Sequence, residues 1–224
     1  MQLGLIGLGK MGFNMRARLR AGGHEVLGYD PRPEVSDVAT LEDLAGALEV
    51  PRVVWVMVPS GTVTEQTIAA LAGVLSEGDL VIDGGNSRYT EDAPRAKLLA
   101  DKGIGFVDAG TSGGIWGLSE GYCIMAGGDP AHVAIEQPIF DALVQPGGFA
   151  HVGPVGAGHF TKMVHNGVEY GMMQAFGEGY ELLHASELGI DVERAIECWR
   201  HGSVVRSWLL DLLAKALAED PKLA

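Results

Sequence analysis

A glycine-rich segment near the start of the chain limits the possible folds more than any other feature. Residues 7–12 read Gly-Leu-Gly-Lys-Met-Gly, between an apolar run at 3–6 and a helical pattern that extends to about residue 21. In such a strand–turn–helix context the first glycine permits the turn, the second lets a pyrophosphate approach the backbone, and the third allows close helix–strand packing. The segment predicts a dinucleotide site, and the alternative is a glycine turn that only shapes the backbone.

The first two thirds of the chain alternate between short apolar runs and helical sequence. Further runs lie at 25–29, 53–58, 80–83 and 105–108, each followed by a helical segment or a polar loop. Two more strands, at 122–126 and 149–152, flank a predicted helix at 131–143. This alternation predicts an α/β fold with a Rossmann-type, mostly parallel sheet.

The pattern changes to helix alone after about residue 156. Helices are predicted over 158–188, from Asp191 at an N-cap to Trp199, and over 204–217. We therefore expect a dinucleotide-binding Rossmann domain over residues 1–156 and a partial all-α domain over 157–224, for substrate binding and oligomerisation. Because the helical part would have little core of its own, we expect it to be truncated or completed by another subunit.

Composition excludes several classes of partner. The 224 residues carry a formal net charge of −13, which argues against nucleic acid or an anionic membrane as the main partner. A small anionic substrate remains compatible with a local cluster of basic groups. Cys123 and Cys198 are too few and too far apart for a disulfide framework or a metal site. With no secretory signal and no run of membrane-spanning length, we expect a soluble, cytoplasmic protein.

Asp30 ends the second predicted strand. An acid at this point commonly binds the adenosine ribose hydroxyls, and its charge repels a 2′-phosphate. The position therefore favours NAD over NADP, although Arg32 offsets part of that charge. The alternative interpretation is that Asp30 is a turn residue before Pro31.

The ends of the third and fourth strands supply further candidates. Ligands of parallel sheets bind beyond the carboxyl ends of the strands, so Val58 and Pro59 are expected at the cofactor and Asn86 at the nicotinamide or the substrate. Asparagine in a Gly-Gly-Asn turn is equally common for backbone reasons alone. The predicted cofactor-binding residues are Gly7, Leu8, Gly9, Lys10, Met11, Gly12, Asp30, Arg32, Val58, Pro59 and Asn86.

A second cluster of chemistry lies in the long predicted helix. At helical spacing Lys162, His165, Asn166, Glu169 and Tyr170 share one face. The flanking residues are mostly apolar or small, as in a helix packed inside a protein, where unpaired charge is costly. Ordinary solvated faces carry runs of Glu and Lys rather than this mixture. We therefore predict a catalytic row facing a substrate cleft; the alternative is a solvated edge or a structural Lys162–Glu169 ion pair.

Together these segments resemble the 6-phosphogluconate dehydrogenase family, in particular its shorter, NAD-linked bacterial branch. They follow the family's order over almost the whole chain. The resemblance is carried by Gly7 to Gly12, Asp83-Gly84-Gly85-Asn86-Ser87, Ser112-Gly113-Gly114, Lys162 to Tyr170, Trp199-Arg200-His201-Gly202 and Arg206-Ser207.

The resemblance implies oxidation of the C3 hydroxyl of 6-phosphogluconate, loss of carbon dioxide and release of ribulose 5-phosphate. Lys162 is implied to take the hydroxyl proton and then to act as the acid on the ketone oxygen. Glu169, protonated at neutral pH, is implied to donate a proton to C1 of the enediol.

Substrate contacts follow from the same resemblance. It implies that His165 and Asn166 donate to substrate hydroxyls and that Tyr170 and Arg206 hold the phosphate. Asn86, Ser112, Gly113 and Gly114 complete the implied substrate site, with the serine and the backbone N–H groups on the carboxylate. From the residues alone, Ser112 to Gly114 is more often a plain loop, and the resemblance reverses that preference. Arg206, within the predicted helix 204–217, could equally form an interhelical salt bridge.

The chain also departs from the long-chain members of that family. Ile115-Trp116-Gly117 replaces an acidic, Arg-containing segment, and Tyr29-Asp30-Pro31-Arg32 replaces a phosphate reader for NADP. Family members also extend further and form homo-oligomers through the helical domain, so a dimer or tetramer is implied, with a partner's tail at the phosphate.

Two other functions remain in view. A 3-hydroxyacid dehydrogenase acting on a compound such as 3-hydroxyisobutyrate would need neither a phosphate site nor a decarboxylation step, so Arg206, Tyr170 and Glu169 argue against it. A non-catalytic dinucleotide-binding module would be expected to have lost Lys162 or Glu169, and both are present.

Overall fold

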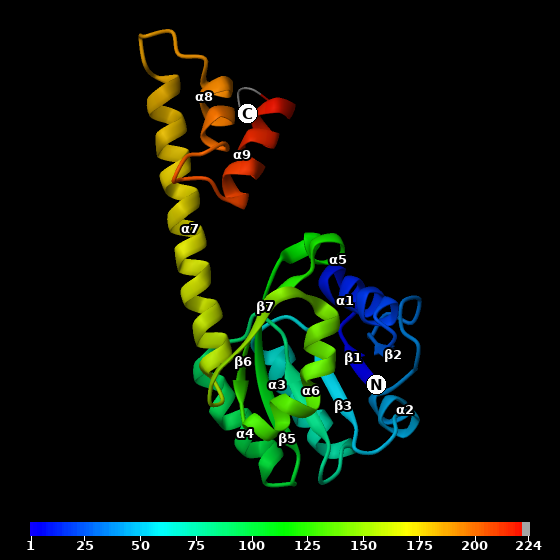
Figure 1. Ribbon diagram of the computed structural model, residues 1–224. Helices are drawn as coiled ribbons and strands as arrows, with labels where there is room; N and C mark the ends of the chain where they lie inside the picture. Colours follow the sequence, from blue (N-terminus) through cyan, green and yellow to red (C-terminus); the bar gives the residue numbers. More distant parts are fainter. Residues whose placement is uncertain (221–224) are drawn as a thin grey trace. The chain divides into compact units, whose positions relative to one another are not determined.

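The computed structural model describes residues 1–220 (Figure 1). The chain divides into two compact units, Met1–Met163 and Val164–Ala224, and the boundary falls inside one long helix, α7 (Ala157–His184). The last four residues of the predicted helical domain, 221–224, lie outside the described residues.

The first unit contains a seven-stranded sheet in the order β2-β1-β3-β4-β5-β6-β7. The first five strands are parallel; β6 is antiparallel to β5, and β7 is parallel to β6. The prediction of a Rossmann-type, mostly parallel sheet is thus confirmed. The strands are β1 (Gln2–Ile6), β2 (Glu25–Tyr29), β3 (Val53–Val56), β4 (Leu80–Asp83), β5 (Gly105–Ser112), β6 (Tyr122–Gly128) and β7 (Val144–Gly153).

Helices cover both faces of this sheet, which explains why its central strands are apolar on both sides. Side chains of α1 and α6 pack on one face, and those of α2, α3 and α4 pack on the other. The helical segments of this unit are α1 (Lys10–Ala21), α2 (Leu41–Ala47), α3 (Thr62–Val74), η1 (Tyr89–Glu91), α4 (Asp92–Ala100), η2 (Gly114–Trp116), α5 (Gly117–Glu120) and α6 (Pro130–Leu143).

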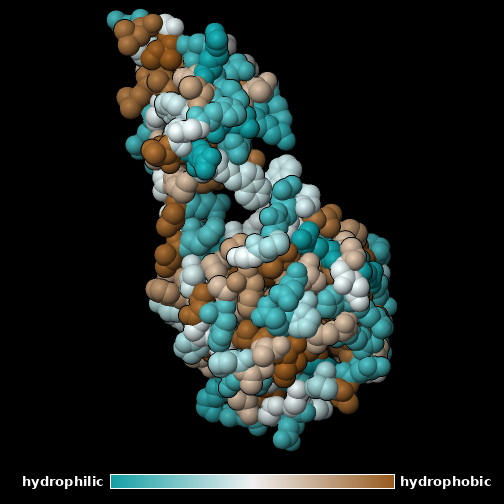
Figure 2. Space-filling view, viewed as in Figure 1, coloured by the Kyte–Doolittle hydropathy of each residue, from teal (hydrophilic) through white to brown (hydrophobic). Residues whose placement is uncertain are grey.

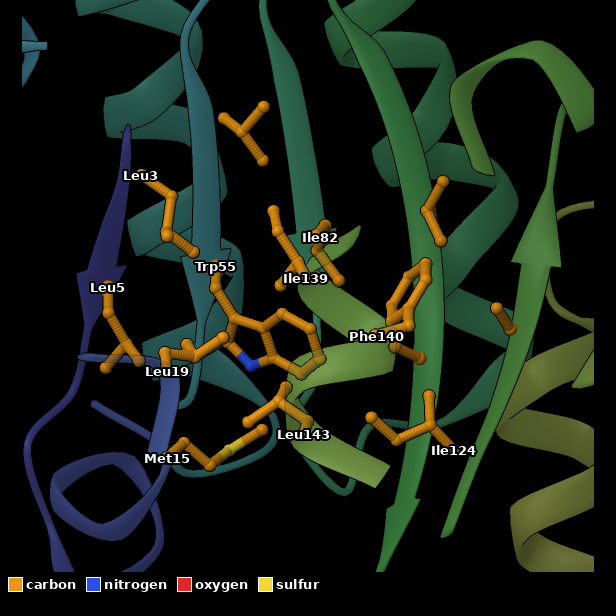
Figure 3. Close-up of a cluster of buried hydrophobic side chains, with 14 of the residues drawn as sticks. Leu3, Leu5, Met15, Leu19, Trp55, Ile82, Ile124, Ile139, Phe140 and Leu143 are labelled. Atoms are coloured by element: carbon orange, nitrogen blue, oxygen red, sulfur yellow. The ribbon is translucent and has the colours of Figure 1, made fainter. Parts of the chain in front are cut away.

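Trp55 on β3 is central to one of the two cores. Its indole is fully buried and meets the ring of Phe140 edge-on, with the ring centroids 6.0 Å apart. Figure 3 shows Met15 and Leu19 of α1 and Leu143 of α6 around the indole. Because side chains alternate along β3, Trp55 faces this cluster while Val54 and Val56 belong to the opposite core.

The second unit contains the remainder of α7 together with α8 (Val192–Trp199) and α9 (Trp208–Glu219). Its fully buried hydrophobic residues within the described range are Ile196, Leu210 and Leu217. The predicted N-cap at Asp191 is confirmed, since its carboxylate accepts a hydrogen bond from the Arg194 N–H at 3.0 Å. Within residues 1–220, no helix is both long and apolar enough to cross a membrane.

One predicted helix begins later than expected. The stretch predicted as helical from residue 204 starts at Trp208, because the Ser207 hydroxyl caps the helix by accepting from the Leu210 N–H at 3.2 Å. The preceding residues form a turn in which the N–H of Arg206 donates to the Ser203 carbonyl at 3.4 Å. The prediction that Arg206 lies within an apolar helix is therefore wrong.

Candidate active site

A cavity of about 550 Å³ lies beyond the carboxyl ends of β1, β2, β3 and β4. β2 and β3 lie on opposite sides of β1, so the strand order reverses at this point. Open α/β sheets bind their ligands at such switch points. The cavity brings together every predicted cofactor residue except Leu8, whose side chain is buried in the core. Its lining comprises Ile6, Gly7, Gly9, Lys10, Met11, Gly12, Tyr29, Asp30, Pro31, Arg32, Met57, Val58, Pro59, Val63, Thr67, Gly85 and Asn86.

The three glycines of the turn have different structural requirements. A Cβ on Gly7, which has φ +90°, would overlap the Met57 carbonyl, and a Cβ on Gly12 would overlap the carbonyl of Gly7. Those two glycines are therefore required by the fold itself. A Cβ on Gly9 would meet no atom within 4 Å, so this glycine keeps space open at the N-terminus of α1. Free backbone N–H groups beside such a space suit a pyrophosphate, so the residues present fit a dinucleotide.

Asp30 and Arg32 form a hydrogen-bonded pair at the edge of the cavity. The Asp30 carboxylate accepts from the Leu8 N–H at 2.8 Å and from Nε of Arg32 at 2.8 Å. The hydrogen bond from Arg32 is the main reason that the pKa of Asp30 falls to about 2, and burial opposes it. The Arg32 side chain stays 53 % exposed. The cavity edge thus presents a charge-compensated carboxylate and an accessible guanidinium.

Asn86 enters the cavity from the turn after β4. Asp83 braces this turn, because its Oδ1 accepts from the Gly85 N–H at 3.0 Å. A Cβ on Gly84 would overlap the buried indole of Trp55, so the Gly-Gly pair lets the turn lie against the core. Gly84 is thus needed for packing of this turn against the core.

Sequence reasoning missed seven lining residues: Ile6, Tyr29, Pro31, Met57, Val63, Thr67 and Gly85. Tyr29 ends β2 and Met57 directly follows β3, so the rule that ligands bind beyond strand ends would have found both. Val63 and Thr67 are four residues apart on α3 and therefore share a face.

The backbone at the start of α7 packs closely against the backbone of the sheet. A Cβ on Gly110 of β5 would overlap Lys162 Cβ and crowd the carbonyl of Gly158. A Cβ on Gly158 would in turn crowd the carbonyls of Asp108 and Met125. Because these glycines have no side chains, α7 can lie close to β5 and β6. This close packing fixes the point from which the Lys162 side chain extends.

Ser112, Gly113 and Gly114 lie at the end of β5. The strand extends further than predicted and includes Ser112, which pairs with Cys123 of β6. Gly113 and Gly114 have φ values of +124° and +51°, a region that other residues rarely adopt. The turn therefore depends on glycine for its backbone shape.

The rest of the predicted row lies on α7 within the second unit. Nδ1 of His165 is 3.7 Å from Oε2 of Glu169 and 3.4 Å from Oδ1 of Asn166. The Glu169 side chain is 40 % exposed, and Tyr170 and Arg206 are also exposed.

The expectation that α7 packs inside the protein is wrong for this chain. The apolar residues beside the row are open to solvent, with Val168 58 % exposed, and Figure 2 shows hydrophobic side chains along the surface of α7. The reason is that the described residues of the chain supply nothing to cover this side of the helix. Its exposed hydrophobic residues between 160 and 173 are Phe160, Met163, Val164, Val168, Tyr170, Met172 and Met173.

One group of side chains among the described residues has the atoms to hold a metal ion: Asp83, Asp92 and His159. Their potential ligand atoms all lie within 4.8 Å of one another. Nη1 of Arg95 is 3.3 Å from an Asp83 oxygen and 3.5 Å from an Asp92 oxygen. The guanidinium thus already balances these carboxylates, so the group is better described as an ion-pair cluster than as a metal site.

Comparison with known proteins identifies the family. Residues 2–153 match the NAD binding domain of 6-phosphogluconate dehydrogenase, and residues 158–188 match the 6-phosphogluconate dehydrogenase C-terminal domain. The chain belongs to the 6-phosphogluconate dehydrogenase family. The resemblance seen in the sequence is thereby confirmed, as is a dehydrogenase with a nicotinamide dinucleotide cofactor.

Two relatives cover most of the chain. Bacillus subtilis YqeC, whose name places it among 6-phosphogluconate dehydrogenases, is 42 % identical over 100 % of this chain and 78 % of its own length. An NAD(+)-dependent, decarboxylating 6-phosphogluconate dehydrogenase from Haloferax volcanii is 40 % identical over 98 % of this chain and 76 % of its own.

Solved structures show the same relationship and one neighbouring family. Plasmodium falciparum 6-phosphogluconate dehydrogenase matches with a TM-score of 0.88 and 29 % identity over 97 % of this chain, which spans 51 % of that protein. Mycobacterium tuberculosis 3-hydroxyisobutyrate dehydrogenase matches with a TM-score of 0.79 and 27 % identity, over 93 % of this chain and 72 % of that one.

Proposed function

We propose that this protein oxidises 6-phosphogluconate at C3 and decarboxylates the product to ribulose 5-phosphate, with NAD preferred over NADP. The proposal rests on the Lys162 to Tyr170 segment of α7, in a chain that belongs to the 6-phosphogluconate dehydrogenase family. It supplies an amine at the start of the helix and a carboxyl group two turns further along it. These are the two proton-transferring groups that the reaction requires.

Lys162 acts first as a base and then as an acid. Its neutral amine takes the proton of the C3 hydroxyl. A nicotinamide dinucleotide, held by the glycine turn and Asp30, would supply the acceptor for the hydride from C3. The resulting ammonium donates a hydrogen bond to the new ketone oxygen and draws electron density toward it. The C–C bond to the carboxylate then breaks, carbon dioxide leaves, and the ketone oxygen takes the Lys162 proton to give an enediol.

Glu169 completes the reaction by donating a proton to C1 of the enediol, which becomes the CH₂OH group of the product. The neutral Lys162 amine takes back the O–H proton at C2, so that the ketone of the product forms. In this chain alone the carboxyl group is 40 % exposed. We infer that substrate and a neighbouring subunit cover it.

The remaining site residues bind substrate. Asn86, Ser112 and the backbone of Gly113 and Gly114 hold the end of the substrate that reacts. His165 and Asn166 donate to the hydroxyls of the chain. Tyr170 and Arg206 bind the phosphate, for which a guanidinium provides two parallel donors.

The cofactor preference rests on Asp30. Its carboxylate repels a 2′-phosphate and accepts from ribose hydroxyls. Arg32, which donates to it, reduces the repulsion and makes the preference partial. The Haloferax volcanii relative, named as NAD(+)-dependent, supports this assignment.

We further propose a homo-oligomer, a dimer or a tetramer, formed through the helical domain. The exposed apolar residues along α7 support it, because soluble proteins seldom leave such a contiguous surface uncovered.

The likeness to 3-hydroxyisobutyrate dehydrogenase favours a second candidate, oxidation of a small 3-hydroxyacid without loss of carbon dioxide. Glu169, Tyr170 and Arg206 count against it, because such a substrate offers no phosphate and needs no proton at C1.

One assay separates the two. The protein is mixed with 6-phosphogluconate and then with 3-hydroxyisobutyrate, with NAD and with NADP, while reduced cofactor and released carbon dioxide are both followed. We expect the highest kcat/KM for 6-phosphogluconate with NAD and one carbon dioxide for each reduced cofactor. Reduced cofactor without carbon dioxide, or a preference for the small acid, would contradict the proposal.

A further inference from the structure

The first turn of α7 is held by a buried ionic cluster that sequence reasoning missed. Nδ1 of His159 lies 2.8 Å from Oδ2 of Asp92 on α4, and both side chains are buried. Asp108 of β5 accepts from the N–H of His159 at 2.8 Å and from the N–H of Gly156 at 2.7 Å. A side chain from the helix and backbone from its first turn are thus anchored to two different elements.

Arg95 extends this cluster toward the cofactor cavity. Its guanidinium, 1 % exposed, bridges Asp92 of α4 and Asp83 of β4 and also pairs with Glu91 at 2.7 Å and Glu65 at 2.6 Å. Asp83 in turn accepts from the Gly85 N–H in the turn that carries Asn86 into the cavity. A continuous path of hydrogen bonds and ion pairs therefore runs from the Asn86 turn to the start of α7.

Protonation of His159 brings the charges of the buried cluster closer to balance, with two cations against three carboxylates. Burial alone lowers the pKa of His159, but the hydrogen bond to Asp92 and the charges of Asp83, Asp92 and Asp108 outweigh it and raise the pKa. With three buried carboxylates and one buried guanidinium, an imidazolium supplies the second positive charge. Glu65 and Glu91, which also face Arg95, are partly open to water.

We propose that the His159–Asp92 pair, joined through Arg95 and Asp83 to the Asn86 turn, positions Lys162 relative to the cofactor cavity. The inference rests on the proposed role of Lys162 as the catalytic base. Lys162 is three residues after His159, one turn further along α7, so any tilt or fraying of the first turn displaces its amine. A misplacement of about 1 Å in a catalytic group can cost about 100-fold in rate. His159 and Asp92 are thus positioning residues.

The test compares His159→Gln and Asp92→Asn with the unmodified protein. His159→Gln should lower kcat about 10- to 100-fold and leave the KM for NAD within about twofold. Asp92→Asn keeps an acceptor for the imidazole but removes the charge that holds its proton. Its loss of kcat should be smaller, and the high-pH limb of its kcat profile should move to lower pH.

Asp79→Asn is the matched control. Asp79 is equally buried and pairs with Arg52 at 2.9 Å, but it precedes β4 and therefore lies at the opposite end of that strand from Asp83. The change should lower thermal stability and leave both kcat and the pH profile unaltered. A folded His159→Gln protein with unaltered kcat, or an equal loss of kcat in Asp79→Asn, would overturn the proposal.

Two further measurements test the proposal if the variants do not fold or if the proposed function is wrong. In the unmodified protein the NMR titration of the His159 ring should coincide with the high-pH limb of kcat, and separate midpoints would overturn the proposal. If the protein does not turn over 6-phosphogluconate, the proposed function fails. Amide exchange at residues 159–163 then tests the cluster alone: faster exchange in Asp92→Asn than in Asp79→Asn supports it, and equal exchange contradicts it.

Discussion

The cofactor cavity and the polar row on α7 differ in how much of their structure one chain supplies. The cavity is formed by four strand ends and two helices of a single unit, and its glycines and its Asp30–Arg32 pair are already in specific contacts. Beyond Lys162, the row lies in the second unit on a helix whose apolar flank is exposed. A site at strand ends can therefore be complete within one domain, whereas a row of residues on one helix needs cover from elsewhere.

Lys162→Ala should produce the largest effect. Loss of the base and acid should lower kcat for 6-phosphogluconate by about 1,000-fold while the Kd for NAD stays within about twofold. Stopped-flow kinetics and NAD titration measure the two quantities. Lys97→Ala, on an exposed lysine of α4, is the control and should keep full activity. An equal loss of NAD affinity in Lys162→Ala would remove its assignment as the base.

Arg206→Ala should rank second, because it removes a charged donor to the phosphate. We expect the KM for 6-phosphogluconate to rise about 10- to 100-fold and the KM for gluconate to change little. Arg194→Ala, another exposed arginine of the second unit, should change neither value. An unaltered preference for the phosphorylated acid would exclude Arg206 from the phosphate site.

The glycine turn allows a sharper test of the cavity. Gly9→Ala should weaken NAD binding about tenfold without loss of stability, because its methyl group enters open space that the pyrophosphate needs. Gly12→Ala should instead destabilise the fold, because its methyl group overlaps the Gly7 carbonyl. Calorimetry of binding and thermal unfolding separate these effects. Tight NAD binding by Gly9→Ala would mean that the ligand lies elsewhere.

Asp30→Ala should have a smaller effect on cofactor choice. Removal of the carboxylate frees Arg32 for a 2′-phosphate, so the ratio of kcat/KM for NAD to that for NADP should fall about five- to tenfold. Measured ratios that do not differ between the variant and the parent would leave Asp30 as a turn residue only.

Glu136→Gln should leave activity unchanged and alter stability alone. Glu136 of α6 is fully buried, and burial raises its pKa well above the ordinary value. Its contribution to stability is therefore complete below the pKa of the unfolded chain and is lost as the pH rises toward the folded pKa. The variant should be more stable than the parent at pH 7 and show no gain near pH 4, by denaturant unfolding. Equal gains at both pH values would contradict this account.

The fold was largely predictable because its signals are local. Each buried strand of the parallel sheet is a short apolar run, and the Gly7 to Gly12 turn is readable from spacing alone. The helix start at Trp208 was missed because Ser207 as a cap was outweighed by the apolar sequence around it.

The candidate site was predictable only in part. Strand ends indicated Asp30, Val58 and Asn86, which do meet in one cavity. The His159–Asp92 pair joins residues 67 positions apart, and no spacing rule connects them. Likewise, the composition of α7 indicates a helix that is to be covered, but it does not say whether the cover is intramolecular or comes from a second chain.

Rapid mixing of Glu169→Gln with 6-phosphogluconate and NAD tests the central claim, that one helix divides the proton transfers between Lys162 and Glu169. Lys162 still takes the hydroxyl proton in this variant. We therefore predict a first turnover of reduced cofactor at nearly the unmodified rate, followed by a steady state at least about 100-fold slower. A first turnover as slow as the steady state, or a steady state equal to that of the unmodified protein, would contradict the division of roles.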